Sequence, residues 1–222
     1  MSGSTGAGGV YPRSARICVI GAGPSGIAGA KALLDEGYDN LVVFDRGHEV
    51  GGNWVFDADS GHSSVFETTH IISSKTYSEY DDFPMPEDYP DYPSHWRLAE
   101  YFQRYAAHFG LYPFIRFRTL VVATEREGDG WRVTTERDGA RTTERFDVLV
   151  VANGHHWKPR WPDYPGELTC RYLHSHDFKR AAPFRGERVL VIGGGNSACD
   201  CAVETSRVSA QTDISWRRGY WI

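Results

Sequence analysis

A glycine-rich run between a strand pattern and a helix pattern constrains the fold of this chain most. Its spacing is G-x-G-x-x-G, and it consists of Gly21, Ala22, Gly23, Pro24, Ser25 and Gly26. The apolar run 16–20 precedes it, and apolar residues recur at helical spacing over 25–36. A second apolar run, 41–44, follows the helix. We therefore predict a βαβ unit, which implies a parallel sheet with a right-handed crossover.

These glycines predict a dinucleotide-binding site. The first glycine permits a tight turn, the second lets the backbone approach a pyrophosphate, and the third allows the helix to pack closely on the strand. The helix N-terminus favours the anion. Asp45 ends the second strand nineteen residues after Gly26, where a carboxylate accepts hydrogen bonds from ribose hydroxyls. A glycine-rich turn with a purely structural role is the alternative.

The pattern recurs near the end of the sequence. The run of Gly193, Gly194, Gly195, Asn196, Ser197 and Ala198 has the spacing G-x-G-x-x-A and lies between a predicted strand, 188–192, and a predicted helix, 197–206. The next strand, 214–216, is followed by Arg217 and Arg218 instead of an acid. Arginine there suits a 2′-phosphate, which favours NADPH over NADH. A solvated strand end is the other interpretation of the arginine pair.

The middle of the chain predicts an antiparallel meander and one long helix. Residues 55–93 lack periodicity, and their many aromatic residues favour an ordered loop over a disordered one. A helix is expected from Ser94 to Phe109, and its apolar side chains available for burial are Trp96, Tyr101, Phe102, Tyr105 and Phe109. Glycine-containing turns separate three strand-like runs, 115–124, 131–136 and 145–152. The end of the last run, 147–152, is apolar enough for a central parallel strand.

These elements predict the α/β class, with two Rossmann-like dinucleotide-binding domains and an antiparallel meander. The expected divisions are a flexible tail (1–15), an FAD-binding domain (16–157), a linker (158–187) and the start of an NADPH-binding domain (188–222), which is incomplete. Two strands and one helix bury little apolar surface, so residues 188–222 alone are expected to be poorly ordered unless docked on the rest.

Composition excludes several other classes of protein. The chain has 24 lysines and arginines against 29 acids, a net charge of −5, which argues against a nucleic-acid binder. No apolar run approaches the ~18 residues of a membrane span. Four scattered cysteines do not form a disulfide scaffold, so a reducing cytoplasm fits best. No histidine pair has a carboxylate or cysteine at ligand spacing, so we expect no metal.

Two dinucleotide sites, the first ending in an acid and the second in arginines, indicate a flavoprotein with FAD in the first and NADPH in the second. Further motifs then resemble the flavin-containing monooxygenases, the class B flavoprotein monooxygenases, over their N-terminal half and from Arg16 to Ile222 of this chain. One motif is a G-G-x-W run that the resemblance places beside the flavin, comprising Gly51, Gly52, Asn53 and Trp54. Others are the runs 151–155 and 173–179.

The most specific family motif is F-x-G-x-x-x-H-x-x-x-Y/F. His174 and Phe178 match it, whereas Leu168 and Cys170 replace its phenylalanine and glycine. Phe178 stands where Baeyer–Villiger relatives carry tryptophan, which favours the branch that oxidises heteroatoms. In the family's active-site segment an asparagine often lies beside the flavin. That position falls on Ile72 here, so the polar contact must come from elsewhere, with Ser73 as the candidate, or be absent.

The resemblance implies an FAD- and NADPH-dependent monooxygenase of the N,N-dimethylaniline type. Such an enzyme inserts one oxygen atom of O₂ into a small nucleophilic substrate, an amine nitrogen or a sulfide, through a C4a-hydroperoxyflavin. No side chain is assigned as a catalytic acid or base. Two alternatives stay open: a Baeyer–Villiger or N-hydroxylating relative, and a fragment or subunit that is inactive without a partner chain or a C-terminal half.

Overall fold

The computed structural model describes residues 11–57 and 61–219, which form two compact units. Unit 1 takes the described residues up to Gly52 together with Ala99–Gly154, and unit 2 takes Asn53–Leu98 with the described residues from His155 onward. The predicted domain bounds differ from this division and stay a prediction. Most of the predicted N-terminal tail lies outside the described residues. The part that is described belongs to unit 1, where Tyr38 Oη donates to Tyr11 O at 2.9 Å.

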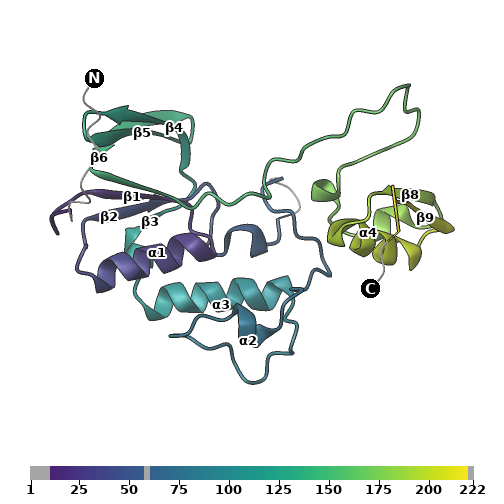
Figure 1. Ribbon diagram of the computed structural model, residues 1–222, viewed down its shortest axis with the longest axis horizontal. Coiled ribbons are helices and arrows are strands. Elements are labelled where there is room, and N and C mark those ends of the chain that lie inside the picture. Colours follow the sequence, from purple (N-terminus) through teal and green to yellow (C-terminus); the bar gives the residue numbers. More distant parts are fainter. Residues whose placement is uncertain (1–10, 58–60, 220–222) are drawn as a thin grey trace. The chain divides into compact units, whose positions relative to one another are not determined.

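Unit 1 is built on a four-stranded parallel sheet in the order β3-β2-β1-β7. Its strands are β1 (Ile17–Ile20), β2 (Leu41–Phe44), β3 (Ile115–Arg116) and β7 (Val148–Val151). Helix α1 (Pro24–Asp35) connects β1 to β2 and covers one face of the sheet (Figure 1). The first predicted βαβ unit is therefore confirmed, with the helix ending one residue early at Asp35.

The meander packs on the other face of this sheet (Figure 1). It consists of the antiparallel strands β4 (Leu120–Glu127), β5 (Gly130–Arg137) and β6 (Ala140–Phe146). Side chains alternate along a strand, so Cys18 and Phe44 reach the meander residues Val133 and Phe146 in one buried cluster. The rings of Phe44 and Phe146 meet edge to face at 6.1 Å. The sheet is thus covered by α1 on one face and by the meander on the other, although Val151 of β7 stays 63% exposed.

Two of the three predicted strand runs are each divided in the structure. The run 115–124 contains β3, which pairs with β2 in the parallel sheet, and the start of β4. Arg118 separates them, because its φ of +53° cannot continue a strand. The run 145–152 likewise holds the end of β6 and all of β7. Strand β7 lies at an edge of the described sheet, so its expected central place is wrong for this part of the chain.

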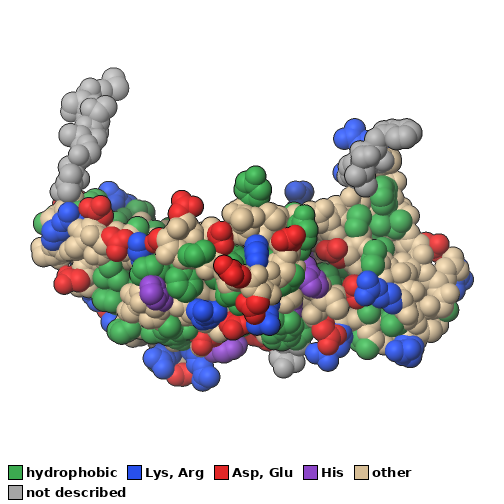
Figure 2. All heavy atoms as spheres, turned by 90° about the horizontal axis from the view of Figure 1, so that it is seen from below, with side chains coloured by type: hydrophobic (Ala, Val, Ile, Leu, Met, Phe, Trp, Pro, Cys, Tyr) green, Lys and Arg blue, Asp and Glu red, His purple; other side chains and the backbone are tan. Residues whose placement is uncertain are grey.

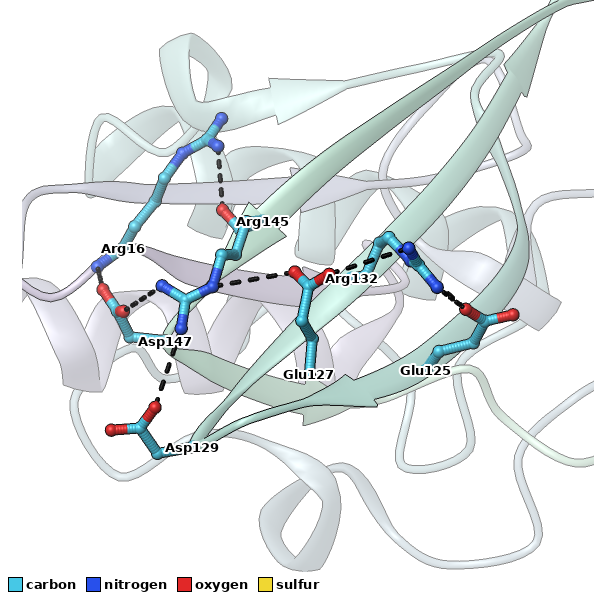
Figure 3. Close-up of polar contacts among 7 residues, drawn as sticks. All are labelled: Arg16, Glu125, Glu127, Asp129, Arg132, Arg145 and Asp147. Atoms are coloured by element: carbon cyan, nitrogen blue, oxygen red, sulfur yellow. Dashed lines mark hydrogen bonds and ion pairs between the residues drawn. The ribbon is translucent and has the colours of Figure 1, made fainter.

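Charged side chains line the outer face of the meander (Figure 3). The Arg145 guanidinium has three carboxylate neighbours: Nε lies 3.7 Å from Glu127 Oε2, Nη2 lies 3.6 Å from Asp129 Oδ1, and Nη1 lies 3.8 Å from Asp147 Oδ1. Arg132 pairs with Glu125 on the neighbouring strand. Exposed ion pairs of this kind stabilise a fold by about 1 kcal/mol or less each.

Helix α3 (His95–His108) buries one stripe of side chains, formed by Leu98, Tyr101, Phe102 and Tyr105. These positions recur every three or four residues and so share one face. The expected burial of Trp96 is wrong: this side chain is 53% exposed, because position 96 lies off the stripe. The preceding loop is irregular apart from η1 (Gly52–Trp54) and α2 (Lys75–Ser78).

Unit 2 contains the second βαβ unit that the sequence predicts. Strands β8 (Arg188–Ile192) and β9 (Gln211–Ser215) are parallel, and α4 (Asn196–Ser206) connects them. The single-turn helices η3 (Ser175–Asp177) and η4 (Ala182–Phe184) precede it, as η2 (Tyr112–Phe114) precedes β3 in unit 1. Three residues form a buried cluster: Phe66 from the loop before α3, Phe178 from the segment before β8, and Cys201 from α4.

The described residues carry surface charges of both signs, and their cysteines form no disulfide. Figure 2 shows lysines and arginines interspersed with acids on one face. No helix within residues 11–57 and 61–219 has the length and apolar character needed to cross a membrane. Over the same residues, no group of three or more His, Cys, Asp and Glu side chains is arranged to hold a metal ion. All four cysteines are free thiols.

Candidate functional site

The first and third glycines of the first turn are required by packing within the chain. Gly21 has a φ of +102°, and a Cβ there would lie 2.4 Å from the carbonyl oxygen of Ala152 at the end of β7. A Cβ on Gly26 would lie 1.8 Å from the carbonyl oxygen of Gly21. Neither side chain fits without moving backbone. Glycine at these two positions is therefore required by the shape of the turn and is not evidence for a ligand.

The middle glycine of the same turn has no such internal reason. Gly23 has φ −73° and ψ −179°, a conformation open to any residue. A Cβ there would meet Gly52 Cα at 3.6 Å, an ordinary van der Waals distance. Gly23 is the N-cap of α1 and provides no side-chain cap. The turn thus leaves space for a group against the backbone at a helix N-terminus, where an anion is favoured.

The predicted Gly51-Gly52 pair lies directly against this turn. Gly51 N donates to Ala22 O at 3.1 Å. Gly52 has a φ of +56°, and its Cβ would approach Gly23 Cα to 2.9 Å. The structure therefore brings Gly52 and the first turn together in unit 1. Its neighbours Asn53 and Trp54 belong to unit 2, where Asn53 Oδ1 accepts from Ser64 N at 2.8 Å and Ser64 Oγ at 2.9 Å.

Asp45 holds the backbone around the turn. Its side chain is buried, and its Oδ2 accepts from Ala22 N at 2.6 Å while Oδ1 accepts from Gly47 N at 2.6 Å. Each carboxylate oxygen has two lone pairs, so one acceptor position per oxygen is left for a ribose hydroxyl. The sequence predicts a ligand contact for Asp45. The structure adds an internal role that the sequence pattern did not indicate.

A second support of the turn has no counterpart in the sequence motifs. Tyr112 Oη donates to Glu49 Oε1 at 2.8 Å, and Glu49 Oε1 also accepts from Val50 N at 2.7 Å. Burial, with the Glu49 carboxylate adding to it, raises the pKa of the Tyr112 phenol. Val50 is fully buried, which fixes the residues entering Gly51 and Gly52. Tyr112 is 63 residues from Glu49, and no local spacing relates the two.

The second turn shares two features with the first: a first glycine with positive φ and a middle glycine at a helix N-cap. Gly193 has a φ of +140°, and its Cβ would lie 3.3 Å from Ala198 Cβ. Gly195, the N-cap of α4, has φ −85° and ψ 175°, and nothing lies within 4 Å of a Cβ there. Asn196 and Ser197 follow in the exposed first turn of α4. Arg217 and Arg218 are exposed after β9.

The remaining predicted site residues lie in unit 2. Ile72 is 77% exposed, and Ser73 Oγ shares a 2.7 Å hydrogen bond with Ser78 Oγ. His174 Nδ1 accepts from His176 N at 3.0 Å, which leaves Nε2 as the proton-bearing nitrogen of the neutral ring. Phe178 is buried against Phe66, with ring centroids 5.4 Å apart. The two matched motif residues thus differ: Phe178 is a core residue, and His174 is half-buried.

His95 is a buried imidazole at the start of α3. Its side chain is fully buried, its ring centroid lies 4.3 Å from that of Trp96 and 5.5 Å from that of Phe56, and Nε2 lies 3.4 Å from Glu67 O. Burial lowers the pKa of this imidazole from its ordinary value of 6.5, although backbone hydrogen bonds oppose the change. The neutral ring is therefore the form that the fold accommodates.

We expect the stability of unit 2 to fall as the pH drops below about 6.5. In that range the unfolded chain takes up a proton on His95 before the folded chain does, so acid favours unfolding. Urea denaturation of wild type and His95→Gln between pH 5 and pH 8 measures the effect, since glutamine does not titrate. A smaller loss of stability with acid is expected in the variant. Equal pH dependence in the two proteins would contradict the prediction.

Comparisons with known proteins converge on one group. The model of a family described as "Flavin-binding monooxygenase-like" matches residues 14–222. Among curated relatives, flavin-containing monooxygenase 5 of Rattus norvegicus is 38% identical over 218 residues, covering 93% of this chain and 41% of the relative. Putative dimethylaniline monooxygenase [N-oxide-forming] 6 of Homo sapiens is 40% identical over 220 residues, again covering 41% of the relative.

Solved structures agree with this fold. S-allyl-L-cysteine S-oxygenase from Allium sativum has a TM-score of 0.84 at 27% identity, over 90% of this chain and 51% of that one. Tmm from Pelagibacter sp. strain HTCC7211 also has a TM-score of 0.84, at 26% identity, over 92% and 51%. An OTEMO complex with FAD and NADP has a TM-score of 0.71 at 22% identity, which shows a shared fold alone. The chain thus spans well under two thirds of the relatives it matches.

Proposed function

This chain belongs to the flavin-binding monooxygenase-like family, and we propose that it binds FAD at its first glycine turn and NADPH at its second. We further propose that the protein uses these cofactors to oxygenate a small substrate with O₂. The chain spans only 41% of the length of the curated relatives, so the monooxygenase activity of the whole protein is itself proposed.

The observation that carries this proposal is the pair of middle glycines. Gly23 and Gly195 have backbone angles open to any residue, and a Cβ on either would meet no atom closer than 3.6 Å. A phosphate lying against the backbone accounts for glycine at both positions. The flanking glycines Gly21 and Gly26 are explained by the fold itself, so they add no support.

The proposed FAD contacts come from the first turn and the segment after β2. We assign the pyrophosphate to the residues around Gly23 and the ribose to the free lone pairs of Asp45. Gly52 would allow close approach to the cofactor, and Asn53, Trp54, Ile72 and Ser73 are proposed to lie beside the flavin. The other contributing residues of the turn are Gly21, Ala22, Pro24, Ser25 and Gly26.

The proposed NADPH contacts come from the second turn and the residues after β9. Gly193, Gly195, Asn196 and Ser197 would hold the pyrophosphate at the N-terminus of α4. Arg217 and Arg218 would bind the 2′-phosphate. His174 is proposed to act near this cofactor as a hydrogen-bond donor through Nε2, and Phe178 to keep the segment packed.

When bound, a flavin reduced by NADPH supplies the oxygen-transfer chemistry. The residues of this chain would bind the two nucleotides and orient them. An amine nitrogen or a sulfide is the proposed substrate class, and the names of the relatives support it, since they include an N-oxide-forming and an S-oxygenating enzyme. Cytoplasmic localisation stays a prediction.

A visible absorption spectrum of the purified 222-residue chain tests the proposal first. Bound flavin with NADPH-dependent O₂ uptake is expected, and a sulfide, a tertiary amine and a ketone are then compared by mass spectrometry of the products. Oxygenation of the ketone alone would favour a Baeyer–Villiger relative. Flavin binding without turnover would indicate that the chain needs a further polypeptide, and absence of flavin binding would overturn the proposal.

The arginine pair predicts a preference for the phosphorylated nicotinamide cofactor. Replacing Arg217 and Arg218 together by glutamine is expected to weaken NADP⁺ binding about 10- to 100-fold and to change NAD⁺ binding little, because only NADP⁺ carries the 2′-phosphate. Isothermal titration with both nucleotides measures this. Arg207→Gln is the control, since Arg207 pairs with Glu204 at 3.3 Å at the other end of α4. Equal losses for the two nucleotides would contradict the assignment.

A further inference from the structure

A lysine joins two segments of unit 2 that are far apart in the sequence. Lys179 Nζ donates to the carbonyl oxygens of Ser63 and, at 3.5 Å, Val65. Glu67 N donates in return to Lys179 O at 2.9 Å. The segment 63–67 is thereby bound to the residue that directly follows the family motif.

The same segment is bound at its other end to Asn53. Ser63 Oγ donates to Asn53 O at 2.6 Å. Ser64 donates twice to Asn53 Oδ1, from N at 2.8 Å and from Oγ at 2.9 Å. We call Asn53, Ser63, Ser64 and Lys179 the lysine clasp. It connects the turn that carries Trp54 to the segment that carries His174.

Packing extends the connection to the second glycine turn. Phe178 precedes Lys179 and is 3% exposed. It packs in one buried cluster with Phe66 and with Cys201 of α4, the helix whose N-terminus carries Gly195. A displacement of segment 63–67 would therefore disturb the position of Phe178 and α4.

The charge of Lys179 makes the clasp specific. Ser63 and Val65 are buried, so their carbonyl groups need donors from within the protein. The ammonium supplies these donors in a half-buried position, where burial lowers its pKa while Asp177 and Asp57 oppose the change. An apolar side chain of similar length would leave both carbonyls without this donor.

We propose that Lys179 is a positioning residue through which occupancy of the FAD site and occupancy of the NADPH site influence each other. The inference rests on the proposed function, because it needs both nucleotides to bind. Ordering of the Asn53–Trp54 turn by one cofactor orders segment 63–67, and through Lys179 and Phe178 it orders the NADPH side. Such coupling is reciprocal: each nucleotide changes the affinity of the other by the same factor.

The test measures the dissociation constant of NADP⁺ with and without saturating FAD. In the wild type FAD is expected to tighten NADP⁺ binding about tenfold, a usual size for coupling between two sites. Lys179→Met is expected to bring this ratio close to one. Ser63→Ala removes the donation to Asn53 O and the weaker acceptance from Val65 N at 3.3 Å, but it keeps Lys179. An intermediate ratio is expected, which serves if the lysine variant folds poorly.

The matched control is Lys75→Met. Lys75 Nζ also donates to backbone carbonyls in unit 2, those of Glu87 at 2.9 Å and Tyr89 at 2.8 Å, but it lies outside the clasp. Loss of this lysine is expected to lower stability and to leave the coupling ratio at the wild-type value. If Lys179 only stabilises the fold, Lys179→Met will likewise lower stability and leave the coupling ratio at the wild-type value.

Hydrogen exchange gives a readout that does not depend on any cofactor. The Glu67 amide, bonded to Lys179 O, and the Ser64 amide, bonded to Asn53 Oδ1, are expected to lose protection in Lys179→Met and to keep it in Lys75→Met. A wild-type ratio of one, or an unchanged ratio in Lys179→Met, overturns this inference alone. A wild type that binds neither nucleotide overturns the proposed function as well.

Discussion

Gly23→Ala is expected to weaken FAD binding by about a hundredfold or more while the free energy of unfolding without cofactor changes by about 1 kcal/mol or less. The backbone angles of Gly23 suit alanine, and its new Cβ would meet Gly52 Cα at 3.6 Å. The same Cβ would occupy the space that we assign to the pyrophosphate. Flavin fluorescence titration and urea denaturation of the apoprotein measure the two quantities separately.

Two glycines of α1 provide matched controls. Gly26→Ala places a Cβ 1.8 Å from Gly21 O and is expected to destabilise the fold by about 3 kcal/mol or more. Gly29→Ala has no atom within 4 Å and is expected to stabilise the helix by about 0.5–1 kcal/mol without affecting FAD. If Gly23→Ala bound FAD as tightly as Gly29→Ala does, the assignment of the first turn would fail.

Asp45→Ala is expected to lower the free energy of unfolding by about 2–5 kcal/mol even without cofactor. Its carboxylate accepts from Ala22 N and Gly47 N, both at 2.6 Å, and Ala22 is fully buried. Removal of the carboxylate leaves these donors unpaired, so the turn loses its support. Asp45→Asn keeps one carbonyl oxygen but turns an NH₂ toward the other donor, and an intermediate loss is expected.

Urea denaturation of the apoprotein measures this loss. The control is Asp35→Asn at the end of α1, where Asp35 pairs with Lys31 at 2.6 Å and its side chain is 56% exposed. An exposed pair of this kind contributes about 0.5 kcal/mol. If Asp45→Ala were no less stable than Asp35→Asn, the carboxylate would have no structural role, and only its proposed ribose contact would remain.

Local sequence patterns predicted the order of the elements in the two βαβ units, although β9 begins three residues before the predicted strand 214–216 and ends one residue before its end. Strand β2 has the predicted bounds, and α1 and α4 each begin within one residue of the expected position. Each of these elements is set by an apolar run, a glycine turn and helical spacing over a few residues. The βαβ unit needs only such neighbouring signals, so its topology follows from short stretches of sequence.

Other features depend on single backbone angles or on distant residues. The apolar run 115–124 gave no sign that Arg118 takes a positive φ and sends β3 and β4 to different sheets. The contacts that support the candidate site join Glu49 to Tyr112 and Ser63 to Lys179, which are 63 and 116 residues apart. No periodicity records such pairs, because each depends on how complete segments pack.

The charges on the meander also determine where this chain is prone to self-associate. Strands β4 and β6 are the meander's edges, and their arginines and acids make pairing with a strand of another molecule unfavourable. Within the described part of the chain, β8 and β9 pair only with each other. On β8, Leu190 is 62% exposed and Ile192 is 56% exposed. A charged side chain in place of one of these two apolar residues is therefore expected to improve the solubility of this chain.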